Sequence, residues 1–146
     1  MLRLVAAVVA GYLAMALLMF ALFSLLYVGL GTEGAFQAGS YDVTVAWNML
    51  SMVLGFVAAV AGGFVAAKIA PGTKAPLALA VVVLVLSFVN VFASLSRPDS
   101  GVRSVSVPTM EAMRHARQPT WLLVLTPLLG AAGVVLGSRL AARRTV

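Results

Sequence analysis

The sequence has no cysteine and a single histidine, His115, and only 10% of its residues are charged. The absence of cysteine excludes a disulfide framework. Structural zinc needs four good ligands and catalytic zinc needs three, and one histidine with four scattered acidic residues does not supply either set. We therefore expect no bound metal and no other cofactor.

The scarcity of charge is matched by an excess of apolar residues. Hydrophobic side chains make up 62% of the chain, whereas an ordinary soluble domain is about 45–50% apolar and about 25% charged. A chain this short still exposes much of its surface when folded, so a single core cannot bury the excess. A soluble enzyme and a disordered chain are both excluded, and an integral membrane protein remains.

The few charged residues divide the chain into four long uncharged stretches, residues 4–32, 43–67, 75–96 and 118–138. Each has the roughly 20 residues that a helix needs to cross a bilayer, and a helix satisfies its backbone polar groups internally. We predict an all-α integral membrane protein, a single transmembrane domain over 1–146 in which helices at 4–30, 44–69, 75–96 and 119–141 form an antiparallel four-helix bundle. The first apolar run is too long for a cleaved signal peptide, so we expect it to be retained.

Lysine and arginine near the ends of the spans predict the orientation of the chain in the membrane. One side carries no acidic residue and has the basic residues Arg3, Lys68, Lys74, Arg139, Arg143 and Arg144. The other side carries the remaining four arginines and all four acids. We expect the side without acidic residues, and with it both termini, to be cytoplasmic. The excess of arginine over lysine is typical of a GC-rich bacterial genome, so we expect the membrane to be a bacterial inner membrane. The net charge of +6 is then a topology signal and an attraction to anionic lipid, with no nucleic-acid partner.

The predicted loops differ in length and composition. In the external loop 97–118, Pro108 and Pro119 bound a stretch that fits a short interfacial helix, and the alternative is a loop that merely covers the bundle. The glycine-rich loop 29–42 is expected to be a flexible connector. The Pro-Gly turn at 70–74 is short, so the second and third spans are predicted to be antiparallel neighbours.

No Asp, Glu, Lys or Arg lies well inside a span, which disfavours a proton-coupled pump. Uncharged polar residues gather instead in the external half of the spans, namely Asn48, Ser51, Ser87, Asn90, Ser94 and Thr126. These residues either hold helices together by hydrogen bonds or line a shallow polar pocket that is open to the outside. Asn48 and Asn90 come at similar depth, which predicts a hydrogen bond between them.

Small residues recur at helical spacing in the second and fourth predicted helices. Gly55 and Gly62 lie on one stripe of the second helix, and Gly133 and Gly137 have a GxxxG spacing in the fourth. Because small residues let helix backbones approach closely, these four glycines are predicted helix-packing positions. Tyr41, Trp47 and Trp121 lie at the external ends of the spans, as expected of an aromatic belt at the membrane interface.

Two functions fit this sequence. The first is a non-enzymatic accessory or scaffold subunit that uses its glycine faces and its external loop to bind another membrane protein or a second copy of itself. The second is a small transporter or carrier whose outward-facing polar pocket takes a lipid or a small neutral solute. A membrane enzyme fits least, because acid–base catalysis needs titratable groups within reach of a substrate and these lie scattered in the loops. The lipid bilayer is the expected surrounding partner in either case.

Overall fold

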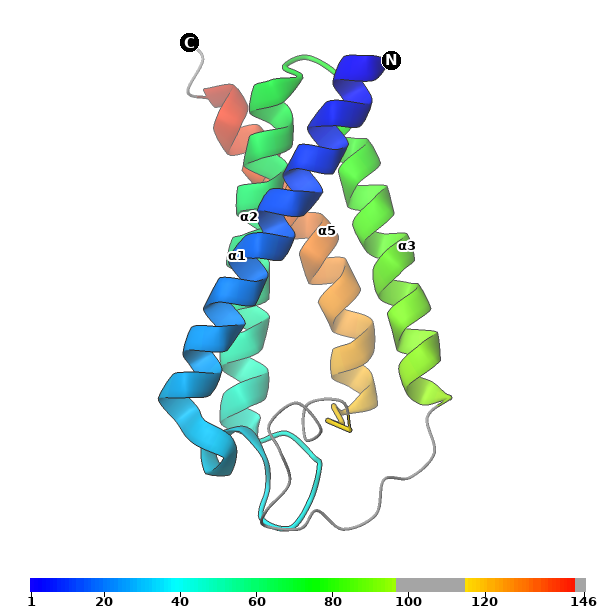
Figure 1. Cartoon of the computed structure of the whole chain (residues 1–146). Helices are drawn as coiled ribbons and strands as arrows, with labels where there is room; N and C mark the ends of the chain where they lie inside the picture. The colour runs from blue at the N-terminus through cyan, green and yellow to red at the C-terminus, as the bar shows by residue number, and fades with distance from the viewer. Residues whose placement is uncertain (97–114, 144–146) are drawn as a thin grey trace.

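The computed structural model describes residues 1–96 and 115–143. Most of them lie in four helices: α1 (Leu2–Ala35), α2 (Val45–Ile69), α3 (Ala75–Leu95) and α5 (Thr120–Arg143) (Figure 1). The described residues contain no strand, only two isolated β-bridges. All four helices are long and apolar enough to cross a membrane. The prediction of an all-helical chain with four long apolar helices is confirmed for the described residues.

The helix ends follow from local sequence. At Gly31 the backbone leaves helical geometry with φ 65° and ψ −179°, so the apolar part of α1 runs from Leu2 to Gly31. α2 ends before Pro71, and Gly72 takes a positive φ in the turn that leads to α3. Most of the predicted interfacial helix of the third loop, and Arg144, lie outside the described residues. The described residues 115–119 are not helical.

Thr44 caps the N-terminus of α2 and ties it to the end of α1. Its Oγ1 accepts a hydrogen bond from the Trp47 backbone N–H at 3.1 Å and donates one to the Gly34 carbonyl oxygen at 2.5 Å. Thr44→Ala is expected to lower the free energy of unfolding by about 1–2 kcal/mol, because one hydroxyl makes both bonds. Thermal unfolding in mild detergent measures the loss. Thr44→Ser keeps the hydroxyl and serves as the control, and equal stability of the Ala and Ser variants would contradict the assignment.

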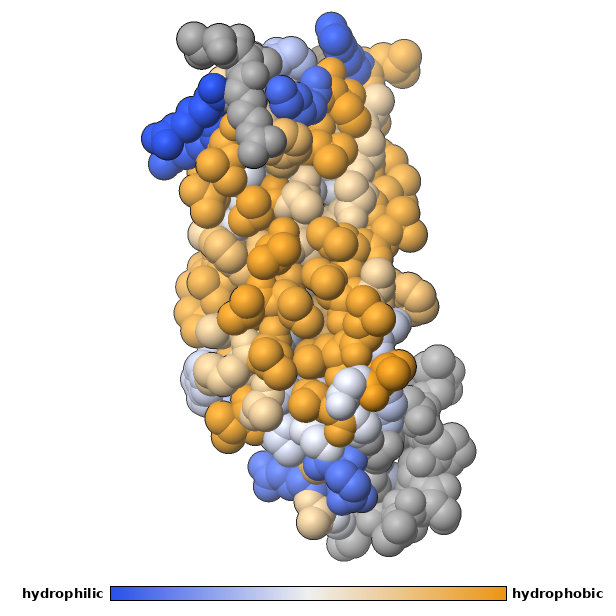
Figure 2. Space-filling model, turned by 90° about the vertical axis from the view of Figure 1, so that its left-hand side faces the viewer, coloured by the Kyte–Doolittle hydropathy of each residue, from blue (hydrophilic) through white to orange (hydrophobic). Residues whose placement is uncertain are grey.

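The two ends of the molecule differ in composition. The start of α1, the 70–74 turn and the end of α5 lie at one end, which carries Arg3, Lys68, Lys74, Arg139 and Arg143 and is called the basic end (Figure 1). Residues 36–44 and 115–119 lie at the opposite end, called the loop end. Figure 2 shows hydrophilic residues at both ends and a broad hydrophobic surface between them. The charges are therefore separated from the apolar middle of the molecule.

The helices do not pack in the order in which they follow one another along the chain. α2 packs mainly on α1 and α5, and α5 also packs on α3. α2 and α3 are joined by a tight turn, but they diverge toward the loop end and make few contacts (Figure 1). The predicted neighbourhood of these two helices therefore applies near the turn and does not extend to the loop end. The reason is that glycine faces of α2 are occupied by α1 and α5, which leaves α3 to pack on α5.

The predicted connector at 29–42 is shorter than expected because α1 runs to Ala35, and residues 36–44 are held by backbone hydrogen bonds and by buried side chains. Phe36 pairs with Val43, and Asp42 pairs with Arg117 of the segment before α5. The Arg117 N–H donates to the Tyr41 carbonyl oxygen at 2.9 Å, and the Val43 N–H donates to the Arg117 carbonyl oxygen at 3.1 Å. Phe36, Tyr41 and Val43 are buried. The glycine-rich composition concealed these three apolar anchors, which join the α1–α2 connection to the start of α5.

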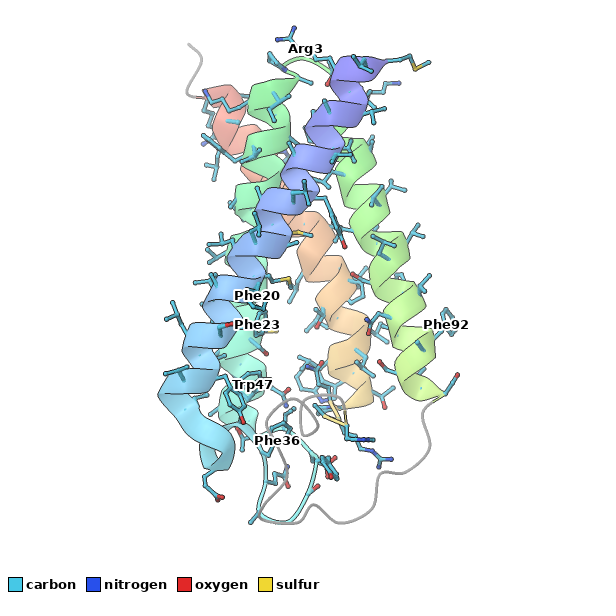
Figure 3. The ribbon with its side chains drawn as sticks, viewed as in Figure 1. Arg3, Phe20, Phe23, Phe36, Trp47 and Phe92 are labelled. Atoms are coloured by element: carbon cyan, nitrogen blue, oxygen red, sulfur yellow. The ribbon has the colours of Figure 1, made fainter. Side chains whose placement is uncertain are left out.

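The aromatic residues of the loop end take two different positions. Trp47 is only 8% exposed and packs on Phe23 and Tyr27 of α1, with ring centroids 6.2 and 6.1 Å away (Figure 3). Tyr41 is also buried, and its ring lies 5.4 Å from that of His115. Trp121 is 54% exposed, as a residue of an interfacial belt would be. Trp47 and Tyr41 are thus packed inside the protein at the loop end, Trp47 against Phe36 and Val43, and only Trp121 of the three is exposed.

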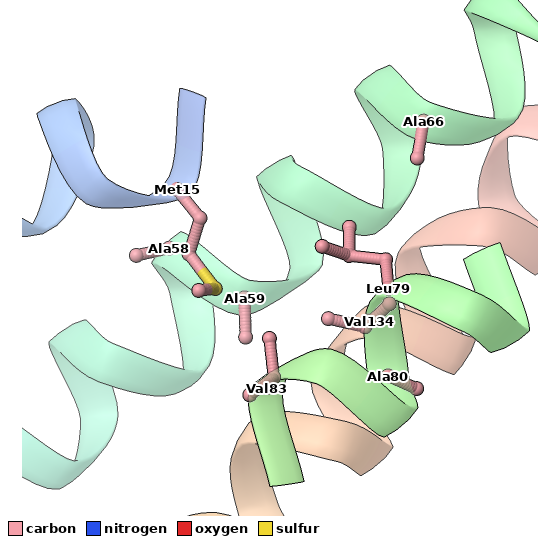
Figure 4. Close-up of a cluster of buried hydrophobic side chains, with 8 residues drawn as sticks. All are labelled: Met15, Ala58, Ala59, Ala66, Leu79, Ala80, Val83 and Val134. Carbon is pink, nitrogen blue, oxygen red and sulfur yellow. The ribbon is translucent and has the colours of Figure 1, made fainter. Parts of the chain in front are cut away.

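The basic half of the bundle is packed through small residues. Its central cluster consists of buried side chains from all four helices, namely Met15, Ala58, Ala59, Ala66, Leu79, Ala80, Val83 and Val134 (Figure 4). A Cβ on Gly11 or on Gly62 would lie 2.8 Å from the other residue's carbonyl oxygen. In the same way a Cβ on Gly63 would collide with the Val134 carbonyl oxygen, and one on Gly137 with that of Val60. The helix backbones are in direct contact here, which closes this half of the bundle.

Candidate functional site

A cavity of about 430 Å³ lies between the four helices, on the loop-end side of the packed basic half. Met15, Ala59 and Val83 belong both to its wall and to the central cluster, so they form its closed floor. From there the wall extends toward the loop end, to Phe23 on α1 and Gln118 before α5. The cavity lies in the half of the bundle where α3 diverges from α2 (Figure 1).

The wall of the cavity is mainly apolar, with a few polar groups. These are Tyr12, Ser51, Ser87, Asn90, Gln118 and Thr126. The apolar part includes Met19, Phe23, Met52, Phe56, Leu86, Val91, Leu122, Leu123, Pro127 and Leu129. No Asp, Glu, Lys, Arg or His is found among the described residues of the wall. A mainly apolar pocket of about 300–1,000 Å³ with few polar groups is typical of a site for a small, largely apolar molecule.

The polar groups of the wall are partly used by the protein itself. Ser51 Oγ donates to the Asn48 carbonyl oxygen at 3.0 Å, and Thr126 Oγ1 donates to the Leu122 carbonyl oxygen at 2.8 Å. Serine and threonine hydroxyls inside helices commonly bond to the preceding turn in this way. Each hydroxyl oxygen still has acceptor capacity, and the Asn90 and Gln118 amides supply donors. The wall can therefore orient one polar group of an otherwise apolar molecule.

The structure brings four of the six predicted polar residues together. Ser51, Ser87, Asn90 and Thr126 line the same cavity, each from α2, α3 or α5. Ser94 lies outside the wall and donates to Asn90 Oδ1 at 3.4 Å. Asn48 is 3% exposed, and it too lies outside the wall.

The predicted hydrogen bond between Asn48 and Asn90 is not formed. The Oδ1 atom of Asn48 is buried without a hydrogen-bond partner, whereas the Oδ1 atom of Asn90 accepts from Ser94. Sequence depth placed the two side chains at the same level, but the divergence of α2 and α3 at the loop end keeps them on separate surfaces. Equal depth on consecutive helices is therefore not enough to predict a contact.

The predicted packing glycines divide into two groups. Gly62, Gly133 and Gly137 stand at close helix contacts, and at Gly133 a Cβ would lie 2.8 Å from that of Ala59. Gly55 does not: a Cβ there would meet only Met19 Cε, at an ordinary 3.6 Å, and Gly55 lines the cavity. Gly55 is thus a cavity residue and not a point of close backbone approach, because the stripe passes from the packed half of the bundle into the cavity.

Sequence reasoning missed two close contacts, those of Gly11 and Gly63. Gly11 follows Ala7 by four residues, and this small-xxx-small spacing was a usable signal. Gly63 stands beside Gly62, and the two face different partners, α1 for Gly62 and α5 for Gly63. The adjacent glycines thus mark α2 as a helix that is held between two others.

No group of three His, Cys, Asp or Glu side chains in residues 1–96 and 115–143 is placed to hold a metal ion. In comparisons with protein-family models, with curated proteins and with solved structures, nothing matches this chain. The features of the chain that bear on its function are therefore the cavity and the packing around it.

Proposed function

We propose that the chain is an integral membrane protein of four antiparallel transmembrane helices in a bacterial inner membrane, with both termini in the cytoplasm. The exposed surfaces of all four helices support membrane insertion, because they carry large apolar side chains such as Phe20, which is 76% exposed, and Phe92. A soluble monomer rarely exposes a continuous apolar surface of this extent. The basic end, rich in arginine and lysine, supports the orientation.

Within that membrane protein, the cavity is proposed to bind a small lipid-like or neutral amphipathic molecule, as in a carrier. The observation that carries this proposal is the apolar-walled cavity of about 430 Å³, with polar groups at Ser51, Ser87, Asn90 and Thr126. An apolar body would pack against the methionine, phenylalanine and leucine side chains, and one polar group would meet the amides or hydroxyls. The scarcity of titratable groups in the described wall supports binding without catalysis.

The packing of the glycines favours this function over an accessory subunit. A subunit that docks through glycine faces needs those faces on its surface, but Gly62, Gly133 and Gly137 contact other helices of the same chain. Docking through other surfaces stays a prediction. It is tested by purification in mild detergent, where a subunit carries a stoichiometric partner and a carrier does not.

Native mass spectrometry of the intact chain, extracted in mild detergent and stripped of its micelle in the spectrometer, tests the binding proposal. The expected result is a discrete adduct of one small molecule per chain that is released on unfolding. A chain that appears only without an adduct, across several mild detergents and after extraction with native lipid, would overturn the proposal.

A further inference from the structure

A second cavity, of about 350 Å³, lies at the basic end between the last turns of α2 and α5 and the turn that joins α2 to α3. Its wall includes the basic residues Lys68 and Arg139 and the hydroxyl residues Thr73 and Ser138. The rest of the wall consists of alanine, proline and glycine. This cavity is separate from the first one, because the two share no lining residue.

Further positive charge lies beside this second cavity. The Arg3 Nε–H donates to the Ile69 carbonyl oxygen at 3.1 Å, which holds its guanidinium against the end of α2. Arg143 follows Arg139 by one helical turn. The two acidic residues within the described ranges, Glu33 and Asp42, lie at the loop end, so neither offsets these charges. The basic groups together produce a concentrated positive potential at this end of the bundle.

Exposed apolar side chains also lie near Arg139 on α5. Leu136 and Leu140 are exposed large hydrophobic residues that flank Arg139 in the sequence. A basic pocket where membrane helices end, next to exposed apolar helix surface, matches the two parts of a phospholipid, whose phosphate lies at the interface and whose acyl chains lie in the hydrocarbon. Lys68 likewise lies next to an apolar group, since its Nζ is 5.7 Å from the centre of the Phe64 ring.

We propose that this second cavity is a binding site for the phosphate-containing headgroup of an anionic phospholipid. Arg139 and Lys68 bind the headgroup from the wall, and the acyl chains lie along Leu136 and Leu140. Arginine suits this role because its planar guanidinium can donate two parallel hydrogen bonds to a phosphate. The site does not depend on the proposed carrier function, because it uses other residues at the opposite end of the bundle.

The test uses the full chain in phosphatidylcholine bilayers that contain a trace of spin-labelled lipid. Electron paramagnetic resonance measures the motionally restricted fraction of spin-labelled phosphatidylglycerol and, separately, of spin-labelled phosphatidylcholine. The wild-type chain is expected to prefer the anionic lipid, and Arg139→Gln is expected to weaken that preference about fivefold. Arg139→Lys should restore part of it, and circular dichroism should show unchanged folding in each variant.

Lys74→Gln is the matched control, since it removes the same charge from the same end but lies outside the wall. It is expected to change the preference less than Arg139→Gln does. Equal losses in the two variants would overturn the site in favour of general surface attraction. Displacement of the labelled lipid by inorganic phosphate, but not by sodium chloride of equal ionic strength, would overturn the lipid assignment in favour of a free phosphate.

Discussion

Gly63→Ala is expected to destabilise the folded bundle by about 3 kcal/mol, the upper end of the cost of overpacking. The added Cβ would collide with the Val134 carbonyl oxygen, a backbone atom that cannot rotate away as the end of a side chain can. Relief requires α2 and α5 to separate along their whole contact, which is the most extensive helix contact in the bundle. Reversible unfolding with increasing sodium dodecyl sulfate, followed by circular dichroism, measures the loss.

Gly55→Ala is the matched control on the same helix. The same methyl group is added there, with the same effect on helix propensity, but it meets only Met19 Cε at 3.6 Å. Its stability should stay within about 1 kcal/mol of the wild-type value. The difference between the two variants isolates the cost of the close contact, and equal stability would show that α2 and α5 do not pack as tightly as described.

Gly55→Leu is expected to remove ligand binding from the main cavity while the bundle stays folded. Gly55 lines the cavity wall, and only one atom lies within 4 Å of its Cβ position, so a leucine side chain would extend into open space. The added atoms occupy the volume that the bound molecule needs. We expect affinity to fall by at least about tenfold, or about 1.4 kcal/mol. The adduct that belongs to the main cavity should disappear from the native mass spectrum, whereas a phospholipid bound at the basic end should remain.

The smaller Gly55→Ala variant should keep the adduct, because one methyl group takes little of the volume. A Gly55→Leu chain that is as stable as the wild type toward sodium dodecyl sulfate, yet binds the molecule as before, would show that the ligand lies elsewhere. Asn90→Leu extends the test to the polar part of the wall. It should weaken binding of a molecule with a polar group, whereas Asn48→Leu should not, because Asn48 lies outside the wall.

The helices were predictable because charge and apolar length determine them locally. Lys74 and Arg97 bracket one uncharged stretch, and within it α3 runs from Ala75 to Leu95. The order of packing was not predictable, because it depends on which small surfaces fit one another. Gly62 and Gly63 are adjacent in sequence but contact different helices, and the stripe through Gly55 gave no sign of where close packing stops.

The candidate site was predictable in part, because the depth of a residue along a span follows from its distance to the span's end. Ser51, Ser87, Asn90 and Thr126 could be assigned to one half of the bundle from their depth alone, and they do share a cavity. The burial of Trp47 depends on the loop at 36–44, where Phe36 and Val43 pack with it. The bridges of this loop join residues far apart in sequence, such as Asp42 and Arg117. Such long-range pairing leaves no periodic signal in a glycine-rich segment.

The central claim, that the main cavity takes a lipid-like molecule, is tested most directly by the fluorescence of Trp47. The chain has two tryptophans, so Trp121→Phe leaves Trp47, which packs on Phe23 of the cavity wall. The chain is placed in bilayers whose phospholipids carry bromine on their acyl chains, since bromine quenches tryptophan at short range. The predicted result is stronger quenching of Trp47 in the Trp121→Phe chain than in the chain that carries both Trp121→Phe and Gly55→Leu. Equal quenching in the two chains, both folded, would contradict the claim.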